Sequence, residues 1–264
     1  VRRYDSTYGS CYGGLVADGE VPQEELAEVI DQVKGPKVAR IQLNGNPLSE
    51  LSVDCDEFDS TWEDFTQIIS LEPSWDDIVA DFSRGHRSSM NKAKREGVEV
   101  VEAEGIDDYR RYYEAYEASL ERWGDDASSV YPWEFFETVH DFAREYPEHI
   151  RLWLAEYEGE VASGALNFYW NHHIDYWHGA AYKKHFDRRP NNLLHPVIIQ
   201  EAVESNERGE TDYRYYDFNP SGGHDGVVSF KGRFGAEKYR FNRGVYRNSL
   251  VEKVGDFASL VSGG

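Results

Sequence analysis

The chain has 264 residues, of which 40% are hydrophobic and 14% aromatic, a composition that supports a packed core and excludes a disordered acidic tail. Its 49 Asp and Glu residues against 28 Lys and Arg residues give a net charge of −21, which argues against a protein that binds DNA through a basic surface. The two cysteines have no metal or redox spacing, no apolar run is long enough to span a membrane, and no signal peptide is visible, so we expect a cytoplasmic protein.

The positive charge is concentrated in one stretch of the sequence. Residues 183–247 hold 12 basic and 9 acidic residues, whereas the rest of the chain holds 16 basic and 40 acidic residues. We therefore expect a confined anion-binding site on an acidic body. Because only 9 of the 28 cations are lysine, the composition also favours a halophile with a high-salt cytoplasm, the alternative being an ordinary acidic protein.

Residues 1–83 are expected to form part of an α/β unit. The expected elements are a helix between Pro22 and Gly35, strands at 38–43 and 65–71, and a helix from the Ser74 cap to Phe82. The segment is small for an independent domain, so we expect its first strands to lie upstream of Val1.

Residues 84–250 are expected to form a larger domain, followed by a C-terminal tail at 251–264. The expected helices are 84–95, 107–124, 132–146 and 191–206, and the expected strands are 99–104, 149–157, 160–170, 173–181 and 213–218. Turn residues separate the three strands between 149 and 181, which predicts an antiparallel meander. Mixed strands and helices in this order are typical of the α+β class.

The strand at 213–218 leads into the segment with the most functional information. A turn with Gly222 and Gly223 follows, and then a cationic segment with Lys231 and Arg233. Glycine lets the backbone approach a ligand, and lysine neutralises a phosphate or carboxylate. We therefore expect an anionic substrate to bind here.

Three residues are candidates for the general base of a reaction at this site. Asp217 ends the strand beside the turn, His224 lies in the segment that follows the turn, and His178 lies on the strand at 173–181; histidine is a common general base. The simpler alternative is that Asp217 caps the turn and that His224 is an ordinary loop residue.

The histidine-rich strand that contains His178 resembles a set of metal ligands. Strand alternation, however, sends His172, Tyr176 and His178 to one face and His173 and Asp175 to the other. No metal site is expected, because ligands on opposite faces cannot converge on one ion.

Two further segments are candidates for binding an anionic donor. The helix at 84–95 carries Arg87, Lys92 and Arg95 and no acidic residue, and its alternative role is to pair with an acidic surface. The second segment consists of Arg188, Arg189, Asn191 and Asn192 at the start of the helix at 191–206. Unpaired N–H groups at a helix start attract anions, although Asn191 or Asn192 would also serve as an ordinary cap beside a solvated basic loop.

Several parts of the chain, in this order, resemble the FemABX-like branch of the GNAT acyltransferase superfamily. They are the basic segment at 83–100, the strand pair around 152–155 and 162–166, the helix start at 190–194, and the strand at 216–218 that leads to the segment at 230–235. The sequence has no serine hydrolase elbow, Walker loop or dinucleotide fingerprint that would favour another class.

The resemblance implies a tandem of two GNAT-like halves, with an incomplete first half at 1–83 and the second at 84–250. It also implies an N-acyltransferase, in which Lys231 matches the substrate-binding lysine of the family. The segment from Arg188 to Asn192 lies at the place of the GNAT pyrophosphate-binding signature. The coiled-coil arm of the members that use tRNA is not evident.

The sequence thus favours transfer of an acyl group from an anionic donor to an amine by direct attack. Acyl-CoA is the favoured donor and co-substrate, no tightly bound cofactor is expected, and the acceptor amine would be carried by a small molecule, a glycan or a peptide. Two alternatives stay open. One is an aminoacyl-tRNA-dependent transferase, and the other is a non-catalytic GNAT-like module that binds a nucleotide-sugar or another polyanion.

Overall fold

The structure is a computed structural model that describes residues 1–7, 11–15, 19, 21–49, 51, 53, 56–124, 127 and 130–251. Its helices are α1 (Gln23–Val33), α2 (Trp75–Asp81), α3 (Arg84–Arg95), α4 (Ile106–Trp123), α5 (Trp133–Glu145), the 3₁₀ helix η2 (Lys183–Arg188), α6 (Asn191–Glu207) and α7 (Asp225–Gly232). Its strands are β1 (Arg2–Asp5), β2 (Val38–Asn44), β3 (Ser60–Ser70), β4 (Glu99–Glu102), β5 (Ile150–Tyr157), β6 (Glu160–Trp170), β7 (His173–Ala181), β8 (Tyr215–Asp217) and β9 (Glu237–Arg247). The expected tail beyond residue 251 lies outside the described residues. Among the described helices, none combines the length and the apolar composition needed to cross a membrane.

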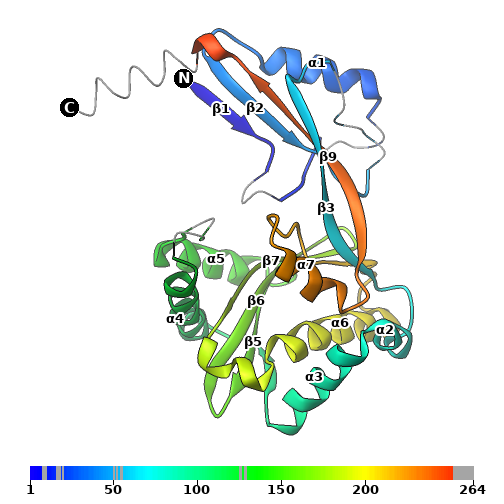
Figure 1. Ribbon diagram of the computed structural model, residues 1–264, viewed down its shortest axis with the longest axis vertical. Helices are drawn as coiled ribbons and strands as arrows, with labels where there is room; N and C mark the ends of the chain where they lie inside the picture. The colour runs from blue at the N-terminus through cyan, green and yellow to red at the C-terminus, as the bar shows by residue number, and fades with distance from the viewer. Residues whose placement is uncertain are drawn as a thin grey trace, which may run out of the picture. The chain divides into compact units, whose positions relative to one another are not determined.

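The chain forms two compact units, each of which is described by itself (Figure 1). The first unit consists of Val1–Thr66 and Lys238–Gly264, and the second consists of Gln67–Glu237. The expected halves at 1–83 and 84–250 are assigned from the family resemblance, and they stay a prediction.

The second unit contains a mixed sheet with the strand order β3-β8-β7-β6-β5-β4. Strands β4 to β7 are antiparallel neighbours, β8 is parallel to β7, and β3 is antiparallel to β8. The predicted meander and the predicted α+β class are therefore confirmed.

Alternating side chains of this sheet fill two hydrophobic clusters, one on each face. Leu152 and Leu154 pack with aromatic residues of α4 and α5, while the intervening Trp153 packs with the cluster of α3 and α6. Figure 1 shows α4 and α5 together, apart from α3 and α6. The second unit is thus a sheet between two helical layers.

An extra residue in β7 changes the direction of its side chains. Leu166 of β6 pairs with His178, but the next residue, Asn167, pairs with Tyr176, so Trp177 is a β-bulge. Tyr176 consequently packs with the α6 cluster, whereas His178 contacts rings of α4 and α5. The prediction that Tyr176 and His178 share one face is therefore wrong, because it assumed regular alternation.

The first unit has the strand order β1-β2-β9-β3, with β1 parallel to β2 and β9 antiparallel to β2. The helix α1 buries Leu26 and Ile30 against Ile41 and Leu43 of β2, as the three- and four-residue spacing of its apolar side chains predicts. The strand β1 was not expected, since all four of its residues are exposed and carry no apolar alternation.

Candidate active site

The strands β7 and β8 of the second unit pair over only part of their length. They pair at three positions, from His173↔Tyr215 to Asp175↔Asp217, and β7 then continues to Ala181. Side chains bond to the β7 backbone at both ends of this continuation: Asn219 donates to the Tyr176 carbonyl, and Ser119 and Arg122 donate to the Ala181 carbonyl. Between these ends, no strand of the described part pairs with this edge of β7.

The residue Asn219 holds the turn that follows β8. Its side-chain amide donates to the Asp175 carboxylate and, at 2.9 Å, to the Tyr176 carbonyl, while its own carbonyl accepts a 2.7 Å hydrogen bond from the Lys231 ammonium. Lys231 is 4% exposed and Asn219 is 7% exposed. The buried lysine of α7 is therefore tied to the turn rather than extended into solvent.

Two carboxyl groups and an imidazole lie together where β7 and β8 separate. The Nε2 atom of His173 lies 3.4 Å from a carboxylate oxygen of Asp217, which is fully buried, and the backbone N–H of Asn219 donates to the other oxygen at 2.7 Å. Burial, and then the neighbouring charge of Asp217, raise the pKa of Asp175 to about 7. One member of this pair can therefore take up or release a proton near neutral pH.

His173, Asp175 and Asp217 are also of the side-chain types that bind metal ions, and they lie close enough together to share one. Ligand atoms of His173, Asp175 and Asp217 all lie within 4.8 Å of one another. The contact between His173 and Asp217 already pairs an imidazole with a carboxylate, so the arrangement does not require an ion.

An aromatic group borders these carboxyls on the same face of the sheet. Phe168 stands directly opposite Asp175 in the β6–β7 register and contacts Trp177. The rings of Tyr131 and Phe135 stack at 4.8 Å and both contact Trp177. The carboxyl pair thus lies beside a group of aromatic rings, of which Phe135, Phe168 and Trp177 are partly exposed.

His178, one of the candidate bases, is engaged by aromatic side chains of α4 and α5. Its Nδ1 atom is 2.6 Å from the Tyr112 hydroxyl, and rings of α4 and α5 surround it. Burial lowers the pKa of His178 to about 4, so the imidazole is neutral at physiological pH.

His224, the third candidate base, is exposed at the start of α7. Its neighbours Gly222 and Gly223 have φ angles of 59° and 80°, a left-handed backbone that glycine adopts without strain. Arg233, at the other end of α7, is exposed. The glycines are therefore explained by the turn itself.

The candidate donor-binding cations of α3 and η2 are largely engaged within the protein. Arg87 donates through its Nη1 atom to the carbonyls of Val79, Ala80 and Phe82, where α2 ends. Lys92 donates to the Asp187 carbonyl at 2.7 Å.

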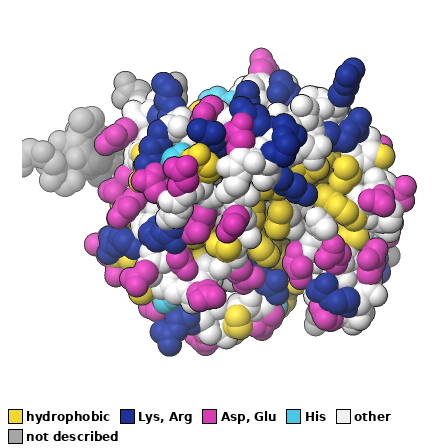
Figure 2. Space-filling model, turned by 90° about the horizontal axis from the view of Figure 1, so that it is seen from below, with side chains coloured by type: hydrophobic (Ala, Val, Ile, Leu, Met, Phe, Trp, Pro, Cys, Tyr) yellow, Lys and Arg dark blue, Asp and Glu magenta, His cyan; other side chains and the backbone are white. Residues whose placement is uncertain are grey.

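Arg188 lies 3.0 Å from Glu96, so it too is paired. Arg95 and Arg189 are exposed, and no ion pair to either is found within the described ranges. On the face drawn in Figure 2, Lys and Arg side chains are interspersed with Asp and Glu side chains.

The start of α6 differs from the prediction. Neither Asn191 nor Asn192 caps the helix, because the N–H groups of residues 192–194 already bond to the carbonyls of Arg189 and Pro190. The Asn192 amide instead donates to Nδ1 of His86 at 2.9 Å. This bond joins α6 to α3.

The residues that the sequence prediction missed are Asp175, His173 and Asn219. The sequence places His173 and Asp175 on one strand face, which is the signal that was available. That this face meets Asp217 depends on the parallel pairing of β7 with β8, which strand alternation does not reveal.

Solved structures share the fold of this chain. FemX aligns with a TM-score of 0.63 at 16% identity, covering 83% of this chain and 76% of that chain. The C-terminal domain of a putative lysylphosphatidylglycerol synthetase from Agrobacterium fabrum aligns at 0.58 and 10% identity, covering 90% and 78%. A tandem GNAT protein from the clavulanic acid biosynthesis pathway aligns at 0.50 and 11% identity, covering 85% and 69%.

These likenesses confirm the predicted GNAT-like fold and agree with the expected FemABX-like resemblance. No curated protein sequence matches the chain significantly. Residues 80–239, more than half of the chain and most of the second unit, match the family described as acetyltransferase (GNAT) domain. The chain therefore belongs to the GNAT acetyltransferase domain family.

Proposed function

We propose that the protein is an N-acyltransferase that moves an acyl group from acyl-CoA to an amine by direct attack. The observation that carries the proposal is the separation of β7 from β8 beyond Asp175 and Asp217. A β-strand edge binds extended chains that contain amide groups by strand addition, and the pantetheine arm of CoA is such a chain. The edge of β7 up to Ala181 therefore suits the acyl donor.

The proposed chemistry takes place beside the carboxyl pair. The amine attacks the thioester carbonyl, the carbon–sulfur bond breaks, and the CoA thiolate leaves with the electron pair. The amine loses a proton to the pair formed by Asp175 and Asp217, directly or through a water molecule. A base with a pKa of about 7 suits this task, because it is largely unprotonated just above neutral pH and still binds a proton well.

Lys231 has a positioning role in this proposal. Its buried ammonium fixes the carbonyl of Asn219, and Asn219 in turn holds the Asp175 carboxylate. Arg95, Arg189 and Arg233 are exposed and are the candidate contacts for the donor phosphates.

The experiment combines the purified chain with a panel of acyl-CoAs and primary amines and measures release of the free thiol. We expect amine-dependent release that Asp217→Asn and Lys231→Ala both reduce at least tenfold, while the exposed Lys94→Ala control behaves as wild type. Circular dichroism checks that each variant is folded.

Binding of acyl-CoA without thiol release for any amine would contradict the catalytic proposal and favour a binding module. Binding of aminoacyl-tRNA with aminoacyl transfer, in the absence of any activity with acyl-CoA, would replace the proposed donor.

A further inference from the structure

A second candidate binding site lies wholly within the first unit. A cavity of about 740 Å³ opens between α1 and the strands β1 and β2, a volume within the range of small-molecule sites. It belongs to neither the carboxyl pair nor the β7 edge, so the inference below does not rest on the proposed acyl transfer.

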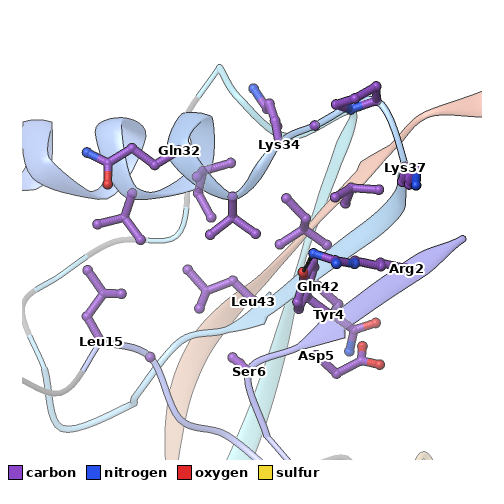
Figure 3. Close-up of a pocket in the computed structure, with 18 residues that line it drawn as sticks. Arg2, Tyr4, Asp5, Ser6, Leu15, Gln32, Lys34, Lys37, Gln42 and Leu43 are labelled. Carbon is purple, nitrogen blue, oxygen red and sulfur yellow. Dashed lines mark hydrogen bonds between the residues drawn. The ribbon is translucent and has the colours of Figure 1, made fainter.

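Apolar and cationic side chains line different parts of this cavity (Figure 3). Leu15 and Leu43 lie at one end, with apolar side chains of α1 and β2 beside them. Lys34 and Lys37 lie at the other end, where α1 is followed by β2, and the Arg2 side chain extends along the strands toward the Tyr4 hydroxyl. The cavity thus has an apolar end and a cationic end.

The few basic residues of this acidic part of the chain are concentrated at the cavity. Residues 1–66 carry 5 basic and 14 acidic residues, yet three of the five basic residues line this one cavity. Lys34 pairs with Asp31 at 2.9 Å, and the one acidic lining residue, Asp5, pairs with Arg40 at 3.2 Å. Arg2 makes a long hydrogen bond of 3.5 Å to the Tyr4 hydroxyl, and within the described part no ion pair engages Lys37.

We propose that this cavity binds an organic oxyanion with an apolar body. The carboxylate or phosphate head contacts Arg2 and Lys37, because a guanidinium and an ammonium favour such oxygens. The hydrocarbon body lies along the apolar lining toward Leu15 and Leu43. Burial of that body supplies most of the affinity, while the cations select the head group.

The test is calorimetric titration of the full chain with decanoate, decyl phosphate, decylamine and decanol, each below its micelle concentration. We expect decanoate or decyl phosphate to bind at least tenfold more tightly than decylamine, and the stronger of the two identifies the head group. Octanoate or octyl phosphate should bind roughly tenfold more weakly than its ten-carbon counterpart, because two methylenes are lost.

Matched variants separate the head-group contacts from general effects of charge. The double variant Arg2→Gln, Lys37→Gln should weaken binding of the anion at least tenfold and leave decanol unchanged. Arg3→Gln removes the same charge from the next position of β1, whose side chain is not part of the lining, and should have little effect. Val29→Trp, at a partly exposed position of α1, should fill the cavity and abolish binding of both the anion and decanol.

Equal affinity for decylamine and decanoate, or an Arg3→Gln effect as large as that of the double variant, would overturn the proposal. So would the absence of binding by all four compounds in a chain whose circular dichroism shows that it is folded.

Discussion

Asp175 gives the candidate site a measurable pH dependence. Its carboxyl has a pKa of about 7, raised first by burial and then by the charge of Asp217. A base must be unprotonated, so we expect kcat/KM of the wild type to rise with pH through a midpoint near 7. Asp175→Asn should remove this rise, whereas the exposed Asp225→Asn should keep it. A wild-type profile that is flat between pH 6 and 8 would contradict the assignment.

Tyr112 tests the interpretation of His178 as a structural residue. Tyr112→Phe removes the 2.6 Å contact with the imidazole and should lower the free energy of unfolding by about 1 kcal/mol. Urea unfolding measures this change. Tyr182→Phe is the control, because no hydrogen bond of the Tyr182 hydroxyl is found within the described ranges. Equal stability of both variants would show that the Tyr112–His178 contact contributes nothing.

At the residue scale, the sequence pointed to the right turn but not to its internal bonds. Asp217 and Lys231 stand out in the sequence because a carboxylate and a lysine flank a glycine-rich turn. Lys231 reaches the Asn219 carbonyl because residues 225–232 fold into α7. No pattern in this short segment predicts that helix. Arg87 was equally ambiguous, since its three carbonyl partners belong to the end of another helix.

At the scale of elements, the packing of α4 on β6 depends on a glycine. A Cβ atom at Gly164 would lie 2.5 Å from the Tyr112 ring and 3.1 Å from Leu154. Gly164→Ala should therefore lower the free energy of unfolding by roughly 1–3 kcal/mol, because a buried ring would have to move.

Gly85→Ala is the matched control for this substitution. A Cβ atom there meets no other heavy atom within 4 Å, and the residue lies in α3, so alanine should stabilise the protein by about 0.5–1 kcal/mol. Chemical unfolding of both variants gives the comparison. A neutral Gly164→Ala would mean that α4 packs less closely on the sheet than the structure indicates.

The elements themselves were largely predictable, because apolar periodicity and caps are local. The helix predicted at 84–95 is α3 to the residue, with the Ser83 side chain accepting from the His86 N–H. The strands predicted at 149–181 match β5, β6 and β7 closely. The bulge at Trp177 was not predictable, since it exists only as a mismatch between the two strands β6 and β7.

At the scale of the whole molecule, buried histidines should make the fold sensitive to acid. Burial lowers the pKa of His86 and His178 to about 4 and that of His195 to about 3, below the ordinary value of 6.5. The unfolded chain therefore binds more protons than the folded protein below pH 6.5. We expect the free energy of unfolding to fall as the pH drops from about 6.5 toward 4.

Asp175 contributes to the pH dependence of stability with the sign opposite to that of the buried histidines. Its pKa is raised, so its contribution to stability is full below its ordinary pKa and is lost as the pH rises through about 7. Asp175→Asn should therefore steepen the acid loss measured by urea unfolding at pH 7.5, 6 and 5. A free energy of unfolding that is constant or rises toward pH 5 would contradict the assignment of neutral buried histidines.

The two short strands β1 and β4 have a consequence for solubility. Each is four residues long and ends the strand order of its own unit. β1 carries Arg2, Arg3 and Asp5, and β4 carries Glu99 and Glu102, so a second copy paired parallel and in register along either edge would place like charges against each other. Charged, short edge strands resist strand-by-strand growth into aggregates. The edge strands β1 and β4 therefore disfavour pairing with the edge strands of further copies of the chain.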